Sequence, residues 1–387
     1  MAYERDLEFI YSNPTKITYR ERCVEDTGVE VSELGCSKAF LVTDSGVVEA
    51  GLAERVQKAL GNKCVGTFEE CCQDSGFHII DKAAGIAREK GADCLVSVGG
   101  GSVIDTTKGM SIVVKSGGKI ADYQGIQLLT EPQTPHIAIT TNAGTGAEVT
   151  NVAVIKDWDR SLKQFFISTY IAPSTAILDP TLTTGLPPML TATTGMDALT
   201  HAIEGMVDTP AEPLVDALGL HATRLIMKNL PICVENGDDL LARGQQMLAA
   251  TIAGIGFSNS QAGLAHTIAH TVGALFGVPH GLGNSIMLPH VILFNLEDAA
   301  DKYAMIAEAM GIDVRGMSDM EAGEAAANAI WELTKRIGVP QKLSEAGVPE
   351  DGLERTAEQA LSDGTIVYNP RMVMDSSEIM ELLKKAW

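Results

Sequence analysis

The first half of the chain alternates short apolar runs with stretches of helical periodicity. The apolar runs, bounded by turn residues, predict strands over 38–44, 63–68, 93–101, 136–141, 152–157 and 174–180. The spacing of apolar residues between them predicts helices over 47–60, over 78–91 and from about Ser102 onward. Strands that alternate with helices in this way indicate a parallel sheet with helices on both faces.

The pattern changes after GLPPML at 185–190, where two prolines interrupt the chain. Beyond this point the apolar residues recur at helical spacing and almost no run resembles a strand. The segments with this spacing are 193–207, 214–230, 242–258 and 324–338. We therefore expect two closely coupled domains, an α/β domain over residues 1–186 and an all-α helical domain over residues 187–387.

Composition narrows the classes of partner. The chain has 387 residues, 45% of them hydrophobic, and a net charge of −21. This acidic balance disfavours nucleic acid and anionic membranes as partners, because both require a basic face. The seven cysteines have no disulfide-like spacing, the first residues lack the apolar core of a signal peptide, and no apolar run is long enough to span a membrane. We expect a cytoplasmic protein.

Histidines gather in the second half of the chain at spacings that favour metal binding. Asp197 and His201 stand four residues apart, His266 and His270 repeat that spacing, and His280 follows a Gly-Pro-bearing stretch. A spacing of four places two side chains on one face of a helix. One carboxylate with three of these four imidazoles is a plausible ligand set for a divalent transition metal. The alternative is that these are hydrogen-bonded core histidines, which is the usual role of a His on an apolar helix.

Two loops of small residues follow predicted strands. The segment SVGGGSVIDTTKG at 97–109 ends a strand and opens a helix, and TTNAGTGAEVT at 140–150 follows another strand. Glycines let a ligand approach the backbone, and amides at a helix N-terminus attract phosphate. Two such loops at the ends of strands suit the pyrophosphate and the nicotinamide-side ribose of a dinucleotide. The alternative for GGGS is a flexible turn.

Asp44 ends the first predicted strand of the sheet. A carboxylate there can accept a bond from a ribose 2′-hydroxyl and would repel a 2′-phosphate. In the common dinucleotide fingerprint the acid follows the glycines by about twenty residues, whereas Asp44 precedes them by more than fifty. The chain therefore departs from the ordinary Rossmann order, and a turn residue in TDSG is the alternative reading.

The segments LVTD, GGGSVID, AGTGAEVT, AILDP, GMDALTHAIE, FSN, GLAHTIAH, PHG and NPR together resemble the iron-containing (group III) alcohol dehydrogenases over essentially the whole chain. Within this family the chain most resembles the lactaldehyde/1,2-propanediol and short-chain alcohol branch. The resemblance implies a dehydroquinate synthase-like fold, in which a dinucleotide-binding α/β domain and a helical domain enclose the active site. It further implies NAD as cofactor, Fe(II) or another divalent metal such as Zn(II), a small alcohol or aldehyde as substrate, and a homodimer or larger homo-oligomer.

The resemblance also implies roles for individual residues. The family's metal ligands fall on Asp197, His201, His266 and His280, and His270 matches a histidine near the nicotinamide that can move the alcohol's proton. We expect Phe257, Thr365 and Val152 to shape the substrate pocket. The cofactor contacts carry over to Asp44, Gly100, Gly101, Ser102, Thr141, Thr145, Thr150 and Lys163.

The chain departs from the family pattern in places. The usual PTTAGTGSE is TTNAGTGAE here, so we expect Asn142 to bond the cofactor where most members have Thr. The Asn-Pro pair near the adenine in many members is replaced by Cys-Gln-Asp-Ser at 72–75, and that contact is not carried over.

Three other functions compete with the alcohol dehydrogenase. One is a polyol or hydroxy-acid dehydrogenase, or a transhydrogenase, on the same scaffold. The second is a lyase of the dehydroquinate synthase type, and the third is a non-catalytic binding protein. The segments 195–206 and 254–277 contain no Arg or Lys, which favours a small, weakly charged substrate over the carboxylated, phosphorylated substrate of such a lyase.

Overall fold

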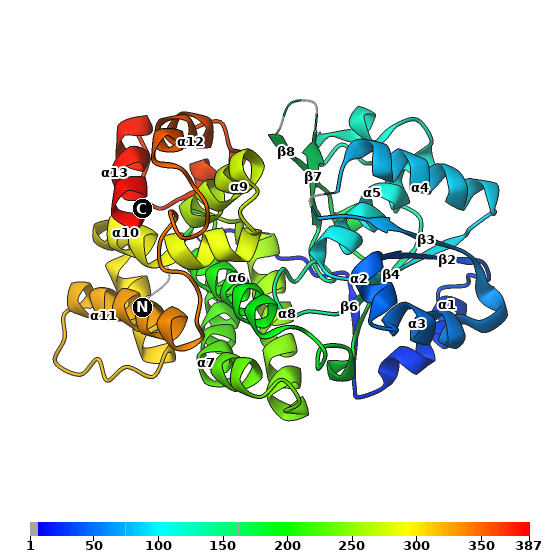
Figure 1. Cartoon of the computed structure of the whole chain (residues 1–387), viewed down its shortest axis with the longest axis horizontal. Helices are drawn as coiled ribbons and strands as arrows, with labels where there is room; N and C mark the ends of the chain where they lie inside the picture. Colours follow the sequence, from blue (N-terminus) through cyan, green and yellow to red (C-terminus); the bar gives the residue numbers. More distant parts are fainter. Residues whose placement is uncertain (1–6, 74, 159, 161) are drawn as a thin grey trace.

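The computed structural model describes residues 7–387 except 74, 159 and 161. An α/β part and a helical part lie side by side, on the right and left of Figure 1. The two parts touch where the loop carrying Gly146 meets α8 (Leu240–Ser260). The backbones are so close there that a Cβ on Gly146 would lie 2.6 Å from the Cα of Gly254. Two backbones approach this closely only where side chains are absent.

Six parallel strands form the main sheet of the α/β part. Their order in space is β1-β9-β6-β4-β2-β3, and every neighbouring pair is parallel. Every residue of β4, β6 and β9 is buried, as in a parallel sheet covered on both faces. The predicted parallel sheet is thereby confirmed. The strands are β1 (Lys16–Tyr19), β2 (Ala39–Asp44), β3 (Cys64–Cys71), β4 (Cys94–Gly99), β6 (His136–Thr140) and β9 (Thr175–Leu178).

Helices cover both faces of this sheet, as the pattern predicted. Phe40 of β2 packs in one core cluster with Ile80 of α4 and Met110 of α5. Leu41, the next residue of the strand, packs in the opposite cluster with Val56 of α3. The helices of this part are α1 (Thr27–Glu33), α2 (Ser45–Glu49), α3 (Leu52–Leu60), α4 (Phe77–Glu89) and α5 (Gly101–Ser116), with the 3-10 helices η1 (Cys23–Asp26), η2 (Gly61–Lys63), η3 (Ile120–Tyr123), η4 (Thr169–Ile171) and η5 (Pro180–Leu182).

Two sequence predictions for this part were wrong in detail. The helix expected over 47–60 is broken into α2 and α3 at Gly51, whose φ of 73° ends a helical turn. The strand over 152–157 exists as β7 (Val152–Asp157), but it lies outside the parallel sheet. It pairs antiparallel with β8 (Leu162–Ile167), which in turn pairs with β5 (Gly125–Ile126). The apolar pattern also missed β1 and β8, which are mostly half-buried or exposed.

The rest of the chain is helical, as predicted. Three of the four predicted segments lie within α6, α7 and α8, and the fourth overruns the end of α11 by two residues. The core of this part packs α6 against α7, α8, α10 and α11. No described helix is long and apolar enough to cross a membrane. The remaining helices are α6 (Pro188–Val207), α7 (Pro213–Glu235), α9 (Leu264–Phe276), α10 (His280–Ala309), α11 (Asp319–Arg336), α12 (Leu353–Ala360) and α13 (Ser376–Ala386), with the 3-10 helices η6 (Glu350–Gly352) and η7 (Gly364–Tyr368).

Candidate metal centre and cofactor site

Three helices bring one carboxylate and three imidazoles together. Asp197 and His201 lie one turn apart on α6, His266 lies on α9, and His280 is the first residue of α10. One possible ligand atom from each lies within 4.8 Å of those of the other three. The chain can return to this point because Gly277 ends α9 in the left-handed conformation, with φ of 73°, three residues before His280. The structure thus gathers the four predicted ligands into one group.

The hydrogen bonds of this group leave nitrogens available for a cation. Nδ1 of His266 lies 2.5 Å from Oε2 of Glu204, so the carboxylate accepts a hydrogen bond from that N–H. Nε2 of His266 is buried without a partner among the described residues and lies 3.9 Å from Oδ1 of Asp197. Nδ1 of His201 and Nδ1 of His280 are also buried without a hydrogen-bond partner among the described residues, and Nε2 of His280 lies 3.3 Å from Oδ1 of Asp197. A carboxylate behind a ligating His orients its ring and raises its basicity, so the residues present fit a metal ion.

The electrostatics favour the neutral form of two of the three imidazoles, those of His201 and His280. Burial lowers the pKa values of His201 and His280 well below the ordinary range, and nearby cationic groups lower them further. Burial also raises the pKa of Asp197. Burial opposes the charging of His266, but the Glu204 carboxylate outweighs it and raises the pKa of that imidazole. Nitrogen and oxygen ligands without a thiolate suit Fe(II), Zn(II), Mn(II) or Ni(II).

Two neighbours complete the surroundings of the group. Asn284, one turn after His280 on α10, donates from Nδ2 to Oδ1 of Asp197 at 2.7 Å. The ring of Phe257 on α8 stacks on His201, with centroids 4.2 Å apart and 15° between the planes. Phe257, expected to shape the substrate pocket, therefore forms an apolar wall directly against one of the four residues.

His270 lies beside the group and outside it. Its ring stacks on that of His280 at 5.2 Å and faces Phe165 of β8 at 5.6 Å. Its Nδ1 lies 3.0 Å from Oδ2 of Asp363. Burial works against the ionised form of Asp363, but hydrogen bonds and the charge of His270 outweigh it and lower the pKa of the carboxyl. His270 is thus the one imidazole of the cluster oriented by a carboxylate from the C-terminal segment.

The two small-residue loops meet at the ends of β4 and β6. Gly100 caps α5, and a Cβ there would lie 2.5 Å from Nδ2 of Asn142. A Cβ on Gly101 would lie 2.8 Å from Cγ2 of Thr145. The amide of Thr141 donates to the carbonyl of Gly99, which joins the loops directly. With Ser102 in the first turn of α5, these residues form a cradle of backbone and short side chains at a helix N-terminus, which suits a phosphate.

The other predicted cofactor residues take different positions. Thr150 is buried, and its hydroxyl accepts a hydrogen bond from Nζ of Lys108 at 2.7 Å. The charge of Lys163 on β8 acts on the group: it opposes the burial that raises the pKa of Asp197, and it adds to the burial that lowers the pKa of His280. Lys163 therefore supplies the positive charge that the segments around the histidines lack.

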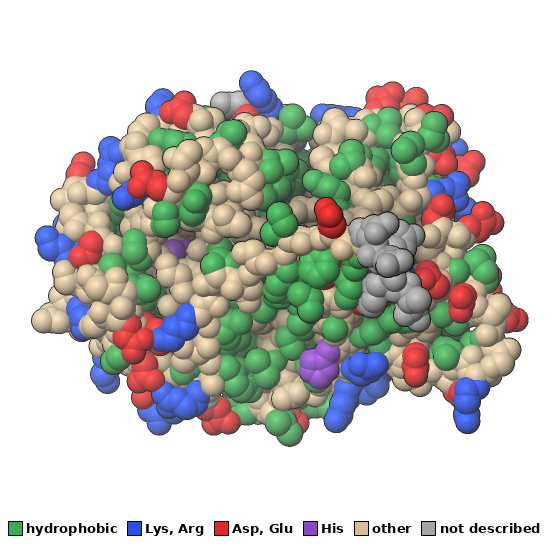
Figure 2. Space-filling model, turned by 180° about the vertical axis from the view of Figure 1, so that it is seen from behind, with side chains coloured by type: hydrophobic (Ala, Val, Ile, Leu, Met, Phe, Trp, Pro, Cys, Tyr) green, Lys and Arg blue, Asp and Glu red, His purple; other side chains and the backbone are tan. Residues whose placement is uncertain are grey.

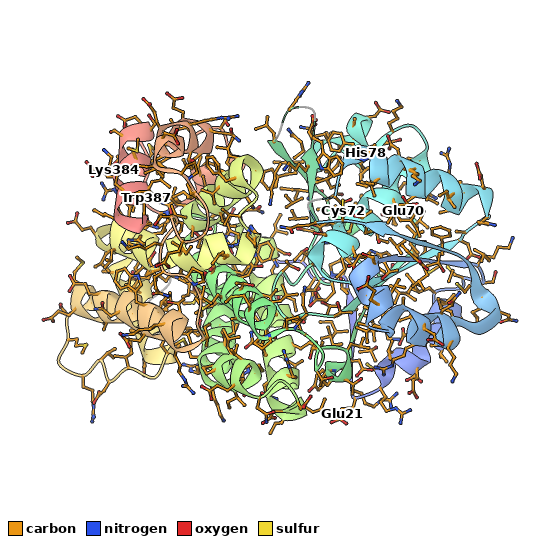
Figure 3. The ribbon with its side chains drawn as sticks, in the orientation of Figure 1. Glu21, Glu70, Cys72, His78, Lys384 and Trp387 are labelled. Carbon is orange, nitrogen blue, oxygen red and sulfur yellow. The ribbon has the colours of Figure 1, made fainter. Side chains whose placement is uncertain are left out.

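Asp44 ends β2, next to β4 in the sheet, and its Oδ1 caps α2 by accepting the amide of Val47 at 2.9 Å. The turn role of Asp44 is therefore present in the structure, alongside the ribose contact we expect. The segment after β3, which carries Cys72, lies in the same α/β part as His78 (Figure 3).

Sequence reasoning missed several residues that support these groups. Glu204 lies three positions after His201, and Asn284 lies four after His280, so helical spacing offered a signal for both. Lys108 carries a weaker signal, because a lysine within an apolar helix is unusual. Asp363 lies 93 residues from His270, and no local pattern joins them.

The comparisons with known proteins cover both parts of the chain. The model described as iron-containing alcohol dehydrogenase matches residues 14–180, and the model of the Fe-containing alcohol dehydrogenase family, C-terminal, matches residues 191–387. The chain is 39% identical to the NAD-dependent methanol dehydrogenase of Bacillus methanolicus, over 94% of this chain and 96% of that protein. It is 36% identical to the lactaldehyde reductase of Escherichia coli strain K12, over 92% of this chain and 94% of that protein. A crystal structure of 1,3-propanediol oxidoreductase superimposes with a TM-score of 0.95 at 36% identity, covering 98% of this chain and 100% of that one.

Proposed function

Because the chain belongs to the iron-containing alcohol dehydrogenase family, we propose that it transfers hydride between a small primary alcohol or diol and NAD. We further propose that Asp197, His201, His266 and His280 hold the metal ion. The observation that carries this proposal is the convergence of these four residues from three helices, with Nε2 of His266 left without a partner. The iron-containing family favours Fe(II), and the ligand set also suits Zn(II).

The metal, when bound, supplies a Lewis acid that lowers the pKa of an alcohol. Around it the chain's own groups position the reactants. Gly100, Gly101 and Ser102 present the backbone to the pyrophosphate of NAD, while Thr141, Asn142, Thr145, Thr150 and Lys163 hold its nicotinamide side. Phe257 keeps water from the face of His201 that it covers. His270 takes the proton of the alcohol at Nε2 and returns it when an aldehyde is reduced.

The organisation of the protein follows from the same proposal. We place the domain boundary between residues 186 and 187, just before α6 begins at Pro188. We propose a homodimer or larger homo-oligomer, since β1 is an edge strand with exposed apolar residues such as Ile17 and Tyr19. Exposed edges of this kind readily pair with another chain. Hydrophobic side chains also gather in the middle of the face in Figure 2. None of the seven cysteines, all within the described residues, forms a disulfide, which supports a reducing compartment such as the cytoplasm.

A screen of NADH formation tests the function. The purified chain, supplied anaerobically with Fe(II) or Zn(II), is mixed with NAD and short alcohols, diols or hydroxy acids. We expect metal-dependent release of free NADH with small primary alcohols or diols. Turnover restricted to hydroxy acids would favour the hydroxy-acid dehydrogenase, and hydride transfer without free NADH would favour a transhydrogenase. No turnover in either direction with any alcohol or aldehyde would overturn the proposal.

A further inference from the structure

The carboxylate of Asp363 holds the ring of His270 from a distant part of the chain. Oδ2 of Asp363 lies 3.0 Å from Nδ1 of His270, and both side chains are at most 10% exposed. We propose that Asp363 is a positioning residue, which keeps the proton of the neutral imidazole on Nδ1 and so leaves Nε2 as the proton acceptor. This inference rests on the proposed function of His270 and deepens it.

The other oxygen of Asp363 is fully occupied, which fixes the carboxylate. Oδ1 accepts the amide of Thr365 at 2.9 Å and its hydroxyl at 2.6 Å. That hydroxyl oxygen lies 2.8 Å from Oγ1 of Thr267, three residues before His270 on α9. The carboxylate is therefore tied to the helix that carries the histidine, and only Oδ2 remains to meet the ring.

The chemistry of the pair decides the tautomer. An ionised carboxylate only accepts hydrogen bonds, so the proton between Oδ2 and Nδ1 belongs to the imidazole. A neutral imidazole carries one proton, and its second nitrogen then has a free lone pair. The Asp363 carboxylate occupies Nδ1, so Nε2 is the ring nitrogen left to act as acceptor. The rings of His280 and Phe165 pack against His270 and restrict rotation of its ring.

The step served by this arrangement balances in protons and electrons. As the alcohol is oxidised, its O–H bond breaks and the proton passes to Nε2 of His270, while the hydride leaves its carbon for the nicotinamide of NAD. His270 becomes an imidazolium, whose charge the Asp363 carboxylate stabilises at Nδ1. The proton then passes to solvent, and the reverse sequence serves aldehyde reduction.

Asp363→Asn tests the proposal with little change of shape. The amide oxygen can still accept both bonds from Thr365, so the amide nitrogen faces His270 and donates to Nδ1, which moves the ring proton to Nε2. We expect kcat to fall about 100-fold or more, within the range for loss of a positioned acid or base. The metal content and the KM for NAD should stay near those of the wild type.

Asp375→Asn is the matched control. Asp375 accepts the amide of Ser377 at 2.8 Å and its hydroxyl at 2.5 Å, the same motif as in Asp363, and it is not paired with a histidine. We expect this variant to keep the wild-type kcat. A similar loss of kcat in both variants would assign the effect to the turn motif and overturn the proposal.

A double-mutant cycle separates positioning from general structural damage. If Asp363 acts through His270, Asp363→Asn slows the wild type but causes no further loss in a His270→Ala background. An equal fold-loss in both backgrounds, or a kcat for Asp363→Asn within about threefold of the wild type, would overturn the inference. A fully active His270→Ala variant would instead refute the role proposed for His270 itself.

Nitrogen NMR of the zinc-loaded chain reads the tautomer without turnover. With histidines labelled at nitrogen, His270 should carry its proton on Nδ1 in the wild type and on Nε2 in Asp363→Asn. A wild-type His270 protonated on Nε2 would overturn the inference even in a chain that proves inactive. The failure of this inference and the failure of the proposed function are therefore distinguishable.

Discussion

The two sides of the domain junction are built by different means. On the helical side the candidate metal centre consists of side chains from α6, α9 and α10. The buried side chains of Glu204 and Asn284 orient two of them, His266 and Asp197. On the α/β side the candidate cofactor site consists largely of backbone, at Gly100 and Gly101, where any Cβ would collide with the neighbouring loop. One side depends on particular side chains being present, and the other depends on their absence.

The helical side gathers several buried polar atoms without a partner at one point. Among the described residues, His201, His266, His280 and Asn284 each contain a buried polar atom without a partner. Across the junction, Nζ of the buried Lys108 donates to Thr150 and to the carbonyl of Val152 at 2.6 Å. Unpaired buried polar atoms cost free energy. A cation bound by this group would offset part of that cost on the helical side.

His266→Ala should have the largest effect, because it removes a side chain that no neighbour can replace. We expect metal content to drop sharply and turnover to fall by several orders of magnitude, while NAD affinity changes little. Metal analysis after purification and steady-state kinetics measure both. His221→Ala, at an exposed position on α7, is the matched control and should behave as the wild type. A His266→Ala chain with full metal content would show that the helical side does not depend on this side chain to hold the metal.

Gly101→Ala should impair cofactor binding on the α/β side by adding a methyl group, whereas His266→Ala acts by removing a side chain. The new Cβ would lie 2.8 Å from Cγ2 of Thr145, and relieving such overpacking costs about 1–3 kcal/mol. We expect affinity for NAD to fall about 10- to 100-fold, with metal content unchanged. Binding is measured by NADH fluorescence. Gly85→Ala, whose Cβ would meet open space on α4, is the control and should leave NADH affinity unaltered. An equal loss of affinity in Gly85→Ala would contradict the proposal that Gly101 belongs to the cofactor site.

Glu204→Gln should sharpen the comparison by weakening the helical side without removing a ligand. The amide carries no charge to support His266, and loss of such support lowers metal affinity about 10- to 100-fold. Competition with a chelator measures this affinity. Glu212→Gln is the matched control, since Glu212 is also buried and accepts backbone amides, at the start of α7. Unchanged metal affinity in Glu204→Gln would show that the carboxylate does not tune the centre.

Asp44→Gly should have the smallest effect and act on cofactor choice alone. We expect the wild type to prefer NAD, because a 2′-phosphate would face the Asp44 carboxylate. Glycine is tolerated as a helix cap, so α2 should lose only a few tenths of a kcal/mol. The preference for NAD over NADP should narrow about tenfold, or about 1.4 kcal/mol. Kinetics with both cofactors measure it, and an unchanged ratio would leave Asp44 with its capping role only.

The sequence predicted the elements and much of the candidate site where the information is local. Spacing of four identified Asp197 with His201 and His266 with His270, and glycines between a strand and a helix identified the cradle. It did not reveal β8, whose residues are mostly half-buried and lack a clear apolar run. That strand matters, because it brings Lys163 and Phe165 to the histidines.

By itself, therefore, the sequence determined the parallel sheet, the change to helices after residue 186 and the residue types available for chemistry. The tertiary structure decided which of these residues meet. His266 and His270 have the same helical spacing as Asp197 and His201, yet His266 joins the candidate metal centre while His270 contacts Asp363. The reason is physical. Periodicity records which face of a helix is buried, whereas the partner of a buried polar group depends on which distant segment packs against that face.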